Sequence, residues 1–73
     1  MDFYRNDQEE LNATIIEEGA VVNMRSTIAD LFYYAEDNDL PEAKTYRLQV
    51  EELHRRYNAL RSHIEMLQDR LTR

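Results

Sequence analysis

A heptad repeat of apolar residues near the C-terminal end of the chain restricts what it can fold into. The repeat advances by alternating steps of three and four residues and consists of Val50, Leu53, Tyr57, Leu60, Ile64, Leu67 and Leu71. This spacing keeps all of these side chains on one face of an α-helix, where a second helix is needed to cover them. We therefore predict a helix over about residues 40–72 that packs against another helix.

The residues that flank this repeat are basic or neutral, and none is acidic. With Val50 at heptad position a, positions e and g are held by Arg47, His54, Arg61, Gln68, Gln49, Arg56, His63 and Arg70. Two parallel copies of this helix would bring arginine against arginine, and like charges at these positions disfavour that pairing. The repeat therefore favours an acidic partner helix.

An acidic partner is present in the same chain. The first 40 residues hold ten acids and two bases, a net charge of −8, whereas the remainder holds five acids and seven bases, a net charge of +2. In an antiparallel hairpin we expect Glu17 beside Arg61, and Asp7 or Glu9 near Arg70. Each exposed pair contributes only about 0–1 kcal/mol, so these charges select the register more than they stabilise it.

The boundary between the two helices lies in the polar segment EDNDLPEAK. Its Asp and Asn residues favour turns and caps over helix interiors. Asp39 followed by Glu42 matches a capping box, which predicts a turn over about 37–40 and the second helix from about residue 40.

The first helix is expected over about 7–37, with Asn6 or Asp7 as its N-cap. Two helices of similar length joined by a short turn predict an all-α fold, an antiparallel helical hairpin with coiled-coil packing. At 73 residues the chain is expected to form a single domain over 1–73.

The apolar stripe of the first helix changes phase near its middle. Its C-terminal half reads Val21, Met24, Ile28, Leu31, Phe32 and Ala35. Continued toward the N-terminus, the same face meets the polar residues Glu17, Thr14 and Glu10. Gly19 lies at the change of phase and tolerates a bend, so we expect an irregularity over 17–23. The alternative is a break there that produces three helices, with Asn23 capping the second.

A second apolar stripe lies on the first helix, about a quarter-turn from the first. It consists of Leu11, Ile15, Val22, Ala29 and Tyr33. A two-helix hairpin cannot cover both stripes, and so short a chain buries little core. We therefore expect the second stripe to bind a second copy, giving a homodimeric four-helix bundle, or to bind another protein. The alternative is a monomer with an exposed apolar face.

No set of residues predicts catalysis, a cofactor or a metal site. The chain has no cysteine, and His54 and His63 point to different flanks of their helix. Glu51 and His54 have the Glu-x-x-His spacing of helical metal sites, but the motif occurs once. No glycine-rich loop is present to hold a phosphate. We therefore expect no enzyme activity.

The remaining features favour a protein that works by binding another protein, as a regulator, inhibitor or co-chaperone. The sequence shows neither an apolar stretch of about 18 residues for a membrane span nor an apolar signal segment. A chain without cysteine fits a reducing compartment, and we expect a cytoplasmic location.

The alternative function is nucleic-acid binding by arginines of the second helix, namely Arg47, Arg55, Arg56 and Arg61. Contacts with phosphates require cations that are not already paired. Because the first helix supplies many carboxylates, we expect these arginines to pair within the fold, and protein binding ranks first.

Overall fold

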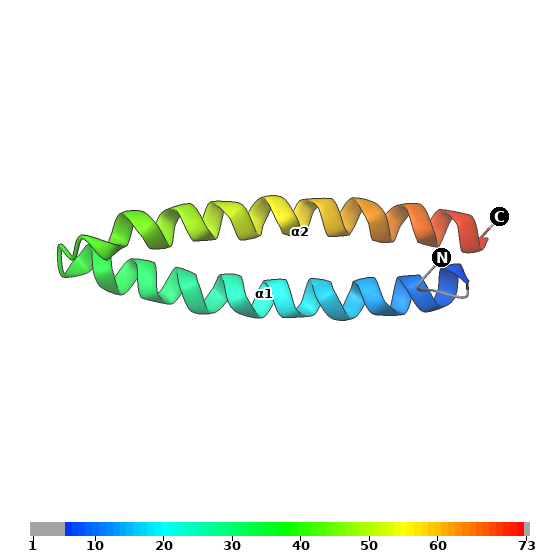
Figure 1. The fold of residues 1–73 in the computed structure, drawn as a ribbon, viewed down its shortest axis with the longest axis horizontal. Helices are drawn as coiled ribbons and strands as arrows, with labels where there is room; N and C mark the ends of the chain where they lie inside the picture. Colours follow the sequence, from blue (N-terminus) through cyan, green and yellow to red (C-terminus); the bar gives the residue numbers. More distant parts are fainter. Residues whose placement is uncertain (1–5, 73) are drawn as a thin grey trace.

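The structure, a computed structural model, describes residues 6–72 and contains two helices joined by a tight turn (Figure 1). α1 spans Asp7–Asp37 and α2 spans Glu42–Thr72. The helices run antiparallel and side by side, so the start of α1 and the end of α2 lie at the same end of the hairpin. The all-α hairpin predicted from the heptad repeat is therefore confirmed.

α1 begins at a side-chain cap. The Asn6 Oδ1 accepts a hydrogen bond of 2.9 Å from the Glu9 N–H, and the Asn6 carbonyl accepts one of 3.2 Å from the Glu10 N–H. The first bond satisfies a donor that the first turn of a helix leaves free, and the second is the first regular hydrogen bond within the helix. The carboxylates of Asp7, Glu9 and Glu10 also lie near the positive end of the helix dipole, which favours the helix start.

α1 ends in a left-handed turn, and α2 begins later than expected. Asp39 has a φ of 52°, its N–H donates to the Glu36 carbonyl at 3.2 Å, and the Leu40 N–H donates to the Ala35 carbonyl at 2.8 Å. These two bonds form a Schellman motif, in which glycine usually holds the left-handed position. Asp39 thus ends α1 instead of capping the next helix, and α2 starts at Glu42.

The apolar repeat of α2 faces α1. Ile64 and Leu67 are fully buried and form a cluster with Leu11 of α1. The other seam residues from Val50 onward are half-buried, except Leu71 in the last turn, which is exposed. The predicted seam is therefore closed from Val50 to Leu67.

α1 contributes a continuous heptad stripe that differs from the predicted one. The residues of this stripe are all buried or half-buried, and they are Leu11, Thr14, Glu18, Val21, Arg25, Ile28, Phe32 and Ala35. Met24 and Leu31, which were expected to face α2, are exposed instead. The seam position beside Met24 belongs to Arg25.

Polar residues fill seam positions of α1 without leaving polar groups unpaired. The Thr14 hydroxyl donates to the Glu10 carbonyl at 2.7 Å, and the Arg25 guanidinium lies 5.1 Å from the centre of the Tyr57 ring. A cation over an aromatic face is an attractive contact. These residues keep one heptad phase along the whole helix.

Within residues 6–72, α1 runs through 17–23 without a break, so the third helix of the alternative does not form and neither a bulge nor a helix end occurs there. α1 is α-helical at every residue of this stretch, including Gly19. The change of phase in the apolar pattern therefore coincides with polar residues on the packed face of a helix that continues without a break.

Within residues 6–72, acids of α1 lie against bases of α2 across the hairpin. The pairs include Glu17–Arg56 at 2.7 Å, Glu18–Arg61 at 2.9 Å, Glu10–His63 at 2.9 Å and Asp7–Arg70 at 3.7 Å. The expected proximity of Asp7 and Arg70 is confirmed. Arg61 pairs with Glu18 instead of the expected Glu17, because these neighbouring glutamates lie on opposite sides of the seam. The distribution of charge therefore matches the antiparallel pairing of the helices.

Candidate interaction surface

Large apolar side chains remain exposed on the sides of α1 that α2 does not cover. The exposed fraction is 74% for Ile16, 63% for Tyr33, 64% for Tyr34 and 45% for Ile15. α2 is amphipathic, since most of its apolar residues lie on the seam while charged residues occupy much of its outer side. A helix that is apolar on several sides is normally covered on several sides. α1 is therefore the candidate interaction element.

One member of the second stripe predicted from the sequence lies elsewhere. Leu11 is 7% exposed and packs in the core with Ile64 and Leu67, so it is not available to a partner. The reason is the heptad phase of α1, which turns Leu11 toward α2. The four others lie on one flank of α1, exposed at the two ends and half-buried between them, and are Ile15, Val22, Ala29 and Tyr33.

Two residues that were not assigned from the sequence complete this flank. With Gly19 and Ser26, it becomes a heptad stripe that advances by alternating steps of four and three, here called the lateral stripe: Ile15, Gly19, Val22, Ser26, Ala29 and Tyr33. None of these side chains is charged. A Cβ atom added at Gly19 would meet no atom within 4 Å, so the stripe is open at this position. When Leu11 is left out, the sequence itself shows the regular alternation of four- and three-residue steps from Ile15 to Tyr33.

A cluster of ionisable groups borders the lateral stripe on the side toward α2. The Arg61 Nη1 donates to the Glu18 Oε2 at 2.9 Å, and this hydrogen bond raises the pKa of Arg61 above its ordinary value. The Arg25 Nη1 lies 3.3 Å from the His54 Nδ1, and its guanidinium stacks over Tyr57. Among the described residues, Arg25 has no carboxylate partner.

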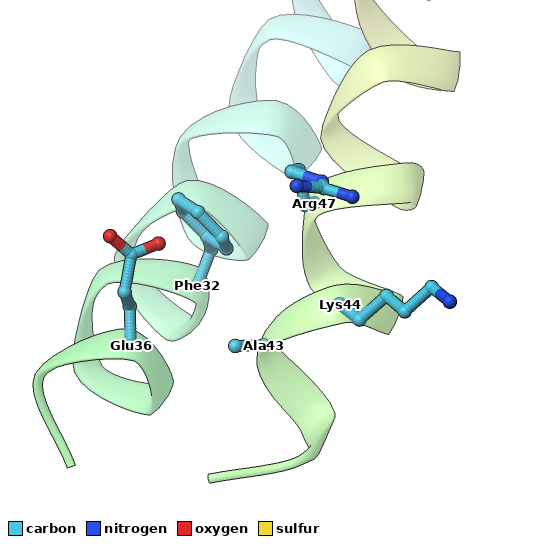
Figure 2. A pocket seen from close by; sticks show the side chains of 5 residues that line it. All are labelled: Phe32, Glu36, Ala43, Lys44 and Arg47. Atoms are coloured by element: carbon cyan, nitrogen blue, oxygen red, sulfur yellow. The ribbon is translucent and has the colours of Figure 1, made fainter. Parts of the chain in front are cut away.

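The surface of the described part of the hairpin has open hollows. One, of about 280 Å³, lies along α1 and is lined by Asn23, Met24, Thr27 and Ile28. Another, of about 250 Å³, lies between the helices near the turn and is lined by Phe32, Glu36, Ala43, Lys44 and Arg47. Figure 2 shows Phe32 and Glu36 on α1 and Ala43, Lys44 and Arg47 on α2, with Lys44 pointing away from α1. The Phe32 ring also packs against Tyr33, with a centroid distance of 5.5 Å, which links this hollow to the lateral stripe.

The arginines proposed as an alternative nucleic-acid surface do not form one free patch. Arg55 pairs with Glu52 of its own helix, and that hydrogen bond raises its pKa. Arg56 and Arg61 pair with glutamates on opposite sides of the seam. Arg47 lines the hollow near the turn. Three of the four charges are therefore engaged by carboxylates.

No cluster of three His, Cys, Asp or Glu side chains suited to hold a metal ion occurs within residues 6–72. Neither helix, as far as it is described, has an apolar stretch long enough to cross a membrane. The lateral stripe and the exposed apolar residues beside it are the surface features that point to a function. No protein-family model, curated protein or solved structure matches this chain.

Proposed function

We propose that this protein is a non-catalytic interaction module that regulates, inhibits or escorts another protein by binding it. The observation that supports this proposal is the exposure of large apolar side chains along α1, with Ile16 at 74% and both Tyr33 and Tyr34 above 60%. Single exposed apolar residues are ordinary, but several on one helix form a surface that water solvates poorly. Aromatic residues such as these tyrosines also suit protein interfaces.

The difference between the two helices supports the same proposal. α2 directs most of its apolar residues toward α1, whereas α1 carries apolar residues toward α2 and away from it. The core of the hairpin is small, with Leu11, Val21, Ala35, Ile64 and Leu67 as its buried apolar members. Association would add apolar burial to this core. A homodimeric four-helix bundle acting in the cytoplasm is part of the proposal.

The test compares the proteins captured by the wild-type chain and by two variants in its native cell. Val22→Glu places a charge on the lateral stripe, and the matched variant Leu48→Glu places one on an exposed apolar residue of α2. Mass spectrometry should identify a protein retained by wild type and by Leu48→Glu but lost from Val22→Glu. Circular dichroism checks that both variants remain helical. Equal capture by both variants would contradict a role for the lateral stripe.

The nucleic-acid alternative is tested by retention on immobilised RNA and DNA at several salt concentrations. Binding to phosphates weakens steeply as salt rises, because cations of the protein release counterions from the nucleic acid. Since Arg56 and Arg61 are paired with glutamates, we expect no such retention of the wild-type chain. If the wild-type chain is retained in a salt-dependent way and the variant Arg55→Ala/Arg56→Ala is not, nucleic-acid binding would replace protein binding as the proposed function.

A further inference from the structure

Gly19 has no explanation within the hairpin. Glycine is among the least favourable residues in the interior of a helix, and the helix gains nothing from its flexibility because it continues unbroken through this position. A Cβ atom there would meet nothing within 4 Å, so α2 does not require its small size. Glycine is also used where another backbone approaches closely. Ser26 and Ala29 extend this narrow strip along the lateral stripe.

The charges beside the lateral stripe identify the approaching element. Glu18 and Arg25 border the stripe one heptad apart and carry opposite charges. The Glu18 carboxylate uses Oε2 for Arg61, which leaves Oε1 to accept from a second guanidinium. Among the described residues, the hydrogen-bond and ring partners of Arg25 are His54 and Tyr57, and neither of them is a carboxylate. A helix that offers an arginine opposite Glu18 and a glutamate opposite Arg25 would complement both.

The chain itself provides such a helix. We propose that α1 of a second copy docks antiparallel on the lateral stripe, with Glu18 of each copy facing Arg25 of the other. Gly19 then lies opposite Ala29 of the second copy and Val22 opposite its Ser26, so the two backbones approach closely at the centre. The larger Ile15 and Tyr33 meet at the two ends. The same surface is used by both copies, as in a two-fold symmetric dimer. This inference rests on the proposed function and assigns the lateral stripe to one occupant.

The hairpin shows that this geometry brings the two charges together. Val21 and Tyr57 are seam residues of the hairpin. The ion pair Glu17–Arg56 joins the residue four positions before Val21 to the residue one position before Tyr57. Glu18 and Arg25 stand in the same relation to Val22 and to Ser26 of the second copy. Cross-helix pairing at these flanking positions is the usual source of register selection in coiled coils.

The charges also exclude the neighbouring registers. A shift of the second helix by one heptad in one direction brings Glu18 against Glu18, and a shift in the other direction brings Arg25 against Arg25. A parallel arrangement in register would place Glu18 beside Asn23 of the second copy and Arg25 beside its Asp30, so it would leave Glu18 without a basic partner. Like charges at flanking positions select against a pairing. The antiparallel arrangement centred near Met24 is the one that satisfies both charges, and it leaves the hollow beside Met24 on another flank of α1.

The first experiment tests the face by adding bulk. Gly19→Leu should fit the isolated hairpin, because the space around Gly19 is open, but should block close approach of a second α1. The control Ala20→Leu adds a larger side chain to the adjacent exposed residue, outside the lateral stripe. In sedimentation equilibrium the wild type and Ala20→Leu should dimerise with rising concentration. Because a symmetric dimer contains two clashes, Gly19→Leu should raise the dimer dissociation constant by about a hundredfold or more while remaining helical.

The second experiment tests the orientation by disulfide formation, which is clean because the chain has no cysteine. The single variants Gly19→Cys and Ala29→Cys are mixed in a glutathione redox buffer and analysed by intact mass. The two substitutions change the mass by different amounts, so mixed and like-with-like dimers are separable. The antiparallel arrangement predicts mixed dimers beyond the random proportion. Dimers that link only like variants would indicate parallel helices and overturn the proposal.

Two further results would overturn the proposal, and they bear differently on the proposed function. If the wild-type chain stays monomeric up to high micromolar concentration, the proposed dimer is wrong. If Val22→Glu nevertheless loses a captured protein, the proposed function is retained and the lateral stripe binds that protein. A Gly19→Leu variant that dimerises like wild type shows that copies meet through another face. Conversely, if the dimer is confirmed but no other protein is captured through α1, this inference is retained and the proposed function is contradicted.

Discussion

Two adjacent valines of α1 test how the helix packs, because the same substitution at both positions differs mainly in the burial of the side chain. Val21 is 2% exposed and faces α2, whereas Val22 is half-buried and lies on the lateral stripe. The substitutions Val21→Ala and Val22→Ala remove the same two methyl groups from neighbouring positions in the same helix. Alanine is the better helix former by up to about 0.5 kcal/mol, and this gain is common to both variants.

The expected loss of stability follows from burial. Removing two fully buried methyl groups costs about 1.6 kcal/mol, and the cavity left behind adds to this. After the gain in helix propensity, Val21→Ala should lower the free energy of unfolding by about 1–2 kcal/mol. The half-buried Val22 loses about half the transfer term, so Val22→Ala should cost no more than about 0.5 kcal/mol in the isolated hairpin. The difference is large for a domain whose total stability is only about 4–11 kcal/mol.

The measurement is urea unfolding followed by far-ultraviolet circular dichroism, at a low and a high protein concentration. At the low concentration, equal unfolding midpoints for the two variants would refute the assignment of Val21 to the seam and Val22 to the flank. At the high concentration the cost of Val22→Ala should grow if α1 pairs with a second copy, because folding and association are then coupled. The cost of Val21→Ala should change little.

Three other substitutions test the ends and the edges of the hairpin. Arg61→Glu should lower the thermal midpoint more than Arg61→Ala, because the new carboxylate repels Glu18, and added salt should reduce the difference in thermal scans. Asn6→Ala should cost about 0.5–2 kcal/mol in urea unfolding because it removes the N-cap of α1, whereas Asn12→Ala in the exposed helix interior should not destabilise. Asp39→Gly should stabilise by about 0.5–1 kcal/mol, since glycine adopts the left-handed conformation at lower cost, and an unchanged or lower unfolding midpoint would contradict the role given to that turn.

The hairpin itself was predictable from local patterns. The repeat from Val50 to Leu71 permits one packed face on the second helix, and its basic flanks favour the acidic first half of the chain as partner. The polar turn residues around Asn38 separate two segments of similar length. Each of these signals depends on spacing and charge along the chain, and these are properties that a helix converts directly into position in space.

The candidate site was predictable in part. Ile15, Val22, Ala29 and Tyr33 lie on one flank of α1 as expected, because their mutual spacing places them there whichever face of the helix meets α2. Leu11 was placed on that flank as well, and the structure turns it into the core. Gly19 and Ser26 were missed, since neither residue is large or apolar enough to mark a stripe.

The face that α1 turns toward α2 depends on the pairing of the two helices. α1 is apolar on several sides, so its periodicity alone does not select one of them. The packed face includes Thr14, Glu18 and Arg25, whose polar groups are acceptable there only because specific partners satisfy them, including a backbone carbonyl for Thr14 and the guanidinium of Arg61 for Glu18. Those partners are brought into reach by the folded backbone, and a buried or half-buried polar group is stable only when such a partner is present. The phase of α1 is therefore a property of the helix pair and not of either helix alone.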